Sequence, residues 1–96
     1  MKLTLEIIES YNFEKKTFKP DWDDVQNDYT LPNGLTIGCL TVCSNEPCKV
    51  DSLEGMDGYI YIETKEQLDD LNSKTFEQIC KEIAKVNENF DIEDYV

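Results

Sequence analysis

The chain has 96 residues, of which 21 are Asp or Glu and nine are Lys, so its net charge is −12 at pH 7. It contains neither Arg nor His. Without His, no Ser–His or Cys–His nucleophile can form within the chain, and without Arg there is no bidentate clamp for phosphate. The four glycines do not have the spacing of a phosphate-binding loop either. We therefore expect a protein that is not an enzyme.

The length suits one small domain over residues 1–96, and 40% of the residues are hydrophobic, enough for a packed core. No apolar stretch approaches the roughly 20 residues that span a bilayer. At the N-terminus, Glu6 interrupts the apolar residues too early for a secretory signal. These features predict a cytoplasmic protein that has no contact with membranes.

Residues 2–8 alternate between apolar and polar, which predicts a half-buried strand. Residues 11–18 are typical of a hairpin whose polar tip, 14–16, lies between aromatic arms. The acidic segment 21–29 is interpreted as irregular or briefly helical. Residues 31–34, with the sequence Leu-Pro-Asn-Gly, predict a turn.

The middle of the chain continues the sheet. We expect a strand at 35–43, a turn, and a short return strand at 48–50. The two glycines in 51–58 predict a loop. Residues 59–63 form the last expected strand.

The C-terminal third predicts helices. Thr64 with Gln67, and Thr75 with Gln78, have the spacing of capping boxes. They begin a short helix over about 65–71 and a longer one whose apolar residues recur at helical spacing from residue 76 to 90. The acidic tail is expected to dock back on the sheet or to form an adhesive end. The whole pattern predicts an α+β fold, a mostly antiparallel sheet of about four or five strands with C-terminal helices packed on one face.

Four cysteines, Cys39, Cys43, Cys48 and Cys80, allow metal binding or disulfides to be considered. On a strand, Cys39 and Cys43 would lie about 13 Å apart, too far to bind one zinc ion. Cys43 and Cys48 flank a four-residue turn and could face one another. Since no secretion signal precedes them, we expect four reduced, metal-free cysteines.

A calcium loop is also excluded. Asp21 and Asp23 begin like an EF-hand loop, but Val25, Gln26 and Pro32 occupy positions that need a ligand, a glycine and a second ligand. We therefore expect neither a metal nor another cofactor.

Acidic residues with aromatic residues among them are the remaining feature. Aromatic anchors ringed by charge are typical of protein-binding hot spots. The segment 21–29 contains four carboxylates, the only Trp and a Tyr, and a second acidic pair lies in the first C-terminal helix. We expect the partner-binding residues to be Asp21, Trp22, Asp23, Asp24, Asp28, Tyr29, Asp69 and Asp70.

In size, acidity and expected α+β build, the chain resembles small acidic inhibitors of basic toxins, such as bacterial immunity proteins, and also phage-encoded DNA mimics and anti-CRISPR proteins. No motif of a particular family accompanies this resemblance. It implies a protein that neutralises a basic partner protein, for example a toxin nuclease or another nucleic-acid-binding protein, and does not itself bind nucleic acid. The alternatives are a phage-type nucleic-acid mimic, a structural or regulatory adaptor, and a cysteine metal-binding module.

Overall fold

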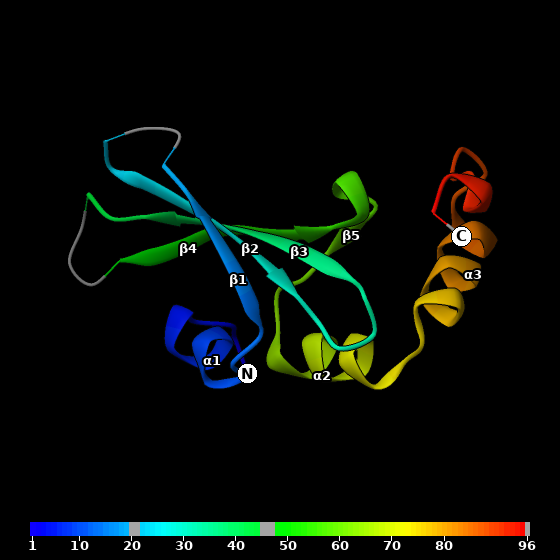
Figure 1. Cartoon of the computed structure of the whole chain (residues 1–96), viewed down its shortest axis with the longest axis horizontal. Coiled ribbons are helices and arrows are strands. Elements are labelled where there is room, and N and C mark those ends of the chain that lie inside the picture. Colours follow the sequence, from blue (N-terminus) through cyan, green and yellow to red (C-terminus); the bar gives the residue numbers. More distant parts are fainter. Residues whose placement is uncertain (20–21, 45–47, 96) are drawn as a thin grey trace.

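The computed structural model describes residues 1–19, 22–44 and 48–95. The elements in chain order are α1 (Leu5–Ser10), β1 (Glu14–Phe18), β2 (Asp24–Thr30), β3 (Thr36–Val42), β4 (Lys49–Gly55), the 3-10 helix η1 (Met56–Gly58), β5 (Ile60–Tyr61), α2 (Lys65–Ser73), α3 (Phe76–Val86) and the 3-10 helix η2 (Ile92–Asp94). The strands form one antiparallel sheet in the order β1-β2-β3-β4-β5 (Figure 1). This confirms the expected α+β fold with C-terminal helices.

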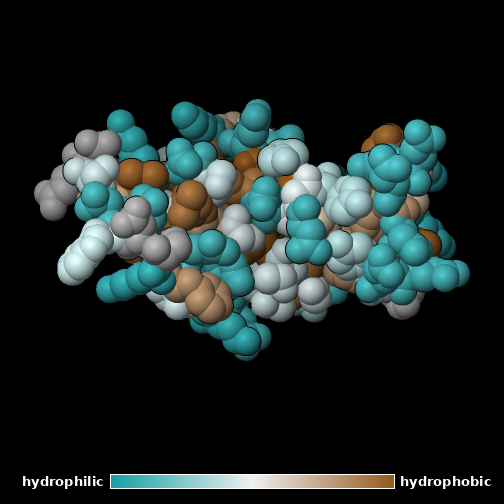
Figure 2. Space-filling model, turned by 90° about the horizontal axis from the view of Figure 1, so that it is seen from above, coloured by the Kyte–Doolittle hydropathy of each residue, from teal (hydrophilic) through white to brown (hydrophobic). Residues whose placement is uncertain are grey.

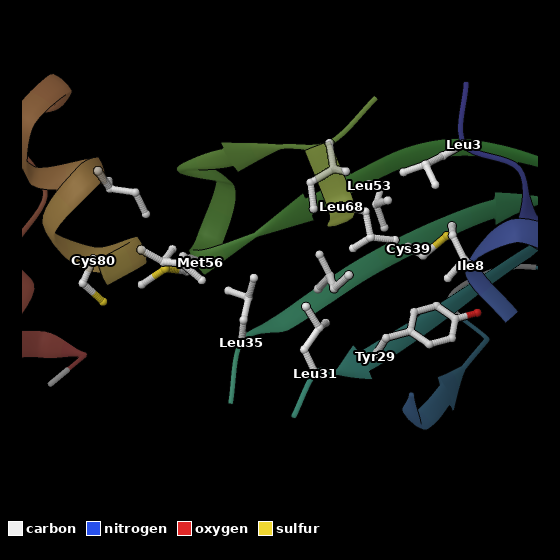
Figure 3. Close-up of a cluster of buried hydrophobic side chains, with 14 of the residues drawn as sticks. Leu3, Ile8, Tyr29, Leu31, Leu35, Cys39, Leu53, Met56, Leu68 and Cys80 are labelled. Carbon is white, nitrogen blue, oxygen red and sulfur yellow. The ribbon is translucent and has the colours of Figure 1, made fainter. Parts of the chain in front are cut away.

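One face of the sheet supplies the core. Along β2, β3 and β4, alternate residues such as Tyr29, Cys39 and Leu53 are buried, as the two-residue period of a strand requires. Helices α1 and α2 lie on this side of the sheet (Figure 1), and their Ile8 and Leu68 are fully buried. Figure 3 shows Ile8 beside Cys39 and Tyr29, with Leu68 beside Leu53. The sheet is therefore closed on one face only.

Helix α3 lies beyond the ends of the strands and extends the core there (Figure 1). Its Cys80 is buried toward Met56 of η1 (Figure 3). The tail packs on this end of the molecule: the ring of Tyr95 stacks on Phe90 at 5.2 Å between centroids, and its hydroxyl donates to Asp57 over 2.9 Å. The acidic tail thus docks against α3 and η1, whereas the sequence left open either docking on the sheet or an adhesive end.

The two predicted capping boxes are confirmed. Thr64 accepts a hydrogen bond from the backbone N–H of Gln67, and the Gln67 side chain accepts one from Thr64 in return. Thr75 and Gln78 repeat the arrangement at the start of α3. Both helices begin where the sequence places them because a capping box satisfies backbone donors within four residues.

The strand predicted over residues 2–8 is wrong. Thr4 caps a helix instead by accepting from the backbone N–H of Ile7, and Leu5–Ser10 is helical. Only the start of the segment is extended, where Leu3 donates to the carbonyl of Glu63 over 3.1 Å. Leu5 and Ile8 are three residues apart, so the apolar residues of this segment fit a helical period as well as a strand period. In the helix, Ile8 points into the core and is fully buried.

The hairpin predicted within residues 11–18 is also wrong, because β1 pairs with β2 over the register from Glu14–Thr30 to Phe18–Gln26. Within the acidic segment 21–29, which was expected to be irregular or briefly helical, the residues from Asp24 onward consequently form a strand. Its core-facing residues include a polar one, Asn27, whose side chain accepts from the Thr17 hydroxyl over 2.7 Å.

Between residues 51 and 58 the expected loop is replaced by the second half of β4 and by η1, and β5 is only two residues long. Within the described ranges, no helix is long and apolar enough to cross a membrane.

The expectation of four reduced cysteines is wrong for two of them. Cys43 and Cys48 form a disulfide that joins the end of β3 to the start of β4. Cys39 and Cys80 are free and buried, and burial raises the pKa of both thiols. They are held among apolar neighbours, as expected for small core residues.

Candidate functional site

Within the described part of the chain, no helix crosses the sheet face opposite α1 and α2 (Figure 1); we call it the open face. The strand register places one residue from each strand in a row across its middle: Lys16, Asp28, Gly38, Glu54 and Tyr61. Two carboxylates therefore flank a position that has no side chain.

Apolar and aromatic side chains accompany these charges. Phe18 faces the same side as Asp28 and is 49% exposed, and Tyr61 is 67% exposed. Leu40 and Val42 are half-buried on the same side. Figure 2, seen from the side away from α1 and α2, shows brown apolar side chains between teal ones over the sheet. Such a mixture of apolar and charged groups suits a protein-binding surface better than a solvated face.

A groove of about 370 Å³ lies at one end of the open face. Gln26, Asp28, Gly38 and Glu54 line it from the sheet, and Asp57, Phe76 and Tyr95 line it from η1, α3 and the tail; Gly34, Thr36 and Met56 complete the lining. The groove is thus bordered by three carboxylates and two aromatic rings.

Ion pairs compensate some of the acids on the helices. Ion pairs of 2.7–3.2 Å hold acids of α1, α2 and α3 to lysines or to the N-terminus: Glu9, Glu66, Asp69, Asp70, Glu77 and Glu82. Among residues 1–19, 22–44 and 48–95, the acids of the open face and the groove have no such pair: Glu14, Asp24, Asp28, Glu54 and Asp57. Other described acids without such a pair, among them Glu6, Glu63, Glu88 and Asp91, lie elsewhere, so the open face is one of several regions of uncompensated negative charge.

Asp69 and Asp70, two of the predicted binding residues, lie on α2 and so on the other side of the sheet. Asp69 pairs with Lys65 and accepts from the Tyr11 hydroxyl, and these contacts lower its pKa. Asp70 pairs with Lys74, which also binds Glu82, and both contacts raise the pKa of Lys74. The structure does not bring these two acids together with those of β2.

Because side chains alternate along β2, the predicted binding residues of the segment 21–29 lie on different faces of the sheet. Asp24 and Asp28 lie on the open face, Asp23 is exposed just before β2, and Trp22 is 99% exposed in the β1–β2 connection. Tyr29 points to the core instead, where its side chain is 1% exposed and its hydroxyl donates to Glu9 over 2.7 Å. Asp21 lies outside the described residues.

The Tyr29–Glu9 contact explains two pKa shifts. Burial, reinforced by the neighbouring carboxylate, raises the pKa of Tyr29, and the donated hydrogen bond lowers the pKa of Glu9 with help from Lys15. The ring is therefore a core residue with a polar contact at its edge, and not part of the surface.

Sequence reasoning did not select Gly38, Glu54 or Tyr61 as site residues. A glycine in the middle of an expected strand was a usable signal, because such a glycine marks a bulge or a close approach. Glu54 could not be selected without the strand register, because its segment was interpreted as a loop.

Among the described residues, no group of three or more His, Cys, Asp or Glu side chains is placed to hold a metal ion. The chain matches no family model, no curated protein and no solved structure. Its function therefore has to be argued from the open face itself.

Proposed function

We propose that this protein binds a basic protein stoichiometrically and covers that protein's cationic surface, without catalysing a reaction. The observation that supports this most directly is the groove at the open face, which brings the carboxylates Asp28, Glu54 and Asp57 together with two aromatic residues, and none of these three acids has a lysine partner among the described residues. Acids kept without partners in the free protein are available to cations of another molecule.

The net charge would act first, at long range. Unlike charges attract over about 10 Å at 0.1 M salt, and a field from −12 charges steers a basic protein toward its acidic side. The exposed rings of Phe18, Trp22 and Tyr61 then supply the apolar contact area that retains the partner.

The partner class follows from the same chemistry. Proteins that grip nucleic acid present Lys and Arg to phosphates, so a surface with several carboxylates competes for the same groups. We propose a toxin nuclease, or another nucleic-acid-handling protein, as the partner, which makes this chain an inhibitor of the immunity-protein type. It would bind neither nucleic acid nor membranes.

We also propose that the protein acts in the cytoplasm. The disulfide between Cys43 and Cys48 counts against this location, because such bonds are more common in oxidising compartments. Fractionation of the native cells shows whether the protein is in the cytoplasm or in an oxidising compartment.

The test uses two double variants that remove the same charge from opposite sides of the sheet. Asp28→Asn with Glu54→Gln neutralises the open face, and Asp69→Asn with Asp70→Asn neutralises α2. The wild-type protein is immobilised to capture partners from native cells; the captured protein is then purified and its association rate is measured for all three forms at low and high salt.

We expect a basic partner whose association slows at least about tenfold between low and high salt. The open-face variant should bind more weakly and associate more slowly, whereas the α2 variant should resemble the wild type. A partner that is neutral or acidic, or rates that ignore salt, would contradict the proposal.

A further inference from the structure

Gly38 occupies the centre of the sheet, in the middle of β3, where its own φ does not require a glycine; the register irregularity between β3 and β4 begins two residues further on, between Leu40 and Thr41. The positive φ angles among described glycines belong to Gly34 and Gly58. A Cβ built on Gly38 would meet Asp28 Oδ1 at 3.6 Å, Gln26 Nε2 at 3.7 Å and the Glu54 carbonyl oxygen at 3.9 Å, which are ordinary contacts. A side chain would be accommodated, so the missing side chain keeps the groove open.

Glycine is a costly residue at this position. It weakens a strand interior because it loses more conformational freedom on folding than alanine and contributes no packing. A strand glycine without a backbone reason is often found where a ligand or another chain approaches closely. The gap above Gly38 is therefore a second indication of a binding site, independent of the charges around it.

We propose that the gap above Gly38 receives an arginine side chain of the basic partner. This rests on the proposed function and names the group that the open face recognises. Asp28 and Glu54 pair with Gly38 from β2 and β4, so their strands lie roughly 10 Å apart on either side of the gap. A cation placed between them is approached by a carboxylate from each side.

The chemistry of the walls favours arginine over lysine. A guanidinium group is planar and offers five donors, so it can serve both carboxylates at once, whereas an ammonium is a compact charge. The rings of Phe76 and Tyr95 line the same groove, and guanidinium groups stack readily on aromatic faces. Gln26 donates to Asp28 over 3.3 Å and leaves the second carboxylate oxygen available.

Lys16 limits the site on one side. It lies opposite Asp28 on β1, and within the described residues no ion pair joins the two. As a cation near the groove it repels an incoming guanidinium. Its removal should therefore strengthen binding, which gives the test a change in the opposite direction.

The experiment titrates a capped tri-arginine peptide, and in parallel a tri-lysine peptide, into isotope-labelled protein and follows the backbone amide resonances by NMR. Gly38→Val fills the gap with a strand-forming residue, and Glu54→Gln removes one carboxylate. Glu6→Gln on α1 is the matched control, because it removes the same charge from the covered side of the sheet. Lys16→Gln is the variant expected to gain affinity.

We expect the shifts to concentrate at Gly38 and its neighbours on β2 and β4, with tri-arginine binding more tightly than tri-lysine. Gly38→Val and Glu54→Gln should each weaken tri-arginine binding, Gly38→Val by about tenfold or more. Glu6→Gln should change it less than twofold, as expected for a distant, screened charge. Shifts spread over the whole acidic surface, or a folded Gly38→Val protein that binds like the wild type, would overturn the proposal.

The two proposals fail separately. If a basic partner is captured with salt-dependent kinetics but Gly38→Val retains full affinity for it, the proposed function stands and the arginine site is rejected. If tri-arginine occupies the gap but captured partners are not basic, the site stands and the proposed function is rejected.

Discussion

Replacing Gly38 with alanine should stabilise the protein. Its backbone lies outside the positive-φ region, and the new Cβ would make contacts of 3.6–3.9 Å, so the folded state accepts it without strain. The unfolded chain meanwhile loses conformational freedom. Such substitutions raise the free energy of unfolding by about 0.4–1 kcal/mol. In a domain of this size that corresponds to a melting temperature higher by roughly 2–8 °C.

Gly34→Ala is the matched control, because it should lower the free energy of unfolding where Gly38→Ala should raise it. Gly34 also has room for a Cβ, with no atom within 4 Å, but its φ is +92°. An L-residue is strained in that region by about 1–2 kcal/mol, so the free energy of unfolding should fall.

Urea denaturation of both variants and the wild type measures the differences in the free energy of unfolding, provided that this free energy falls with urea concentration at the same slope in all three proteins. If Gly38→Ala destabilises as much as Gly34→Ala, the glycine is needed for packing or backbone geometry. The argument that the gap is kept open for a ligand would then be refuted.

Three other outcomes are expected. Trp22→Ala should change stability by no more than about 0.5 kcal/mol, because the side chain is 99% exposed, and should cost about 2 kcal/mol or more of partner binding if the ring is an anchor. Alkylation after unfolding without reductant should label two cysteines and spare Cys43 and Cys48, as mass spectrometry can show; four labelled cysteines would contradict the disulfide. The lowered pKa of Glu9 stabilises the fold at pH values above its ordinary value of 4.5, and this contribution is lost as the pH falls through the lower folded value. Tyr29→Phe should therefore show a shallower loss of stability in acid than the wild type.

The elements that could be predicted from sequence are those fixed by neighbouring residues. Thr64 with Gln67 and Thr75 with Gln78 satisfy helix donors within four residues, so both helices were located correctly. The first helix was missed because the apolar residues of positions 2–8 fit the period of a strand as well as that of a helix. Thr4 decides for the helix, because its side chain caps the first turn.

Strand β2 was missed for a different reason. Its core-facing side contains Asn27, which interrupts the apolar alternation that identifies a half-buried strand. Asn27 is tolerated in the core because Thr17, ten residues earlier, bonds to it. A partner on another strand cannot be read from the local pattern.

The acidity of the proposed binding surface could be predicted, but its location could not. Composition fixes the excess of acids over lysines, whereas strand register and helix faces decide which acids meet a lysine. Asp70 and Asp28 both stand in short acidic groups of the sequence, yet Asp70 meets Lys74 four residues later, and Asp28 faces the gap above Gly38. The distinction arises only from the folded chain.

The open face also combines features that do not help the fold. Carboxylates without lysine partners repel one another, a strand glycine costs conformational entropy, and exposed aromatic rings favour association with other molecules. All three occur together on the open face. A sequence selected for stability alone would fill the gap and pair the acids, because such changes are readily found. Their combination on one face is what the proposed binding of a basic partner would explain.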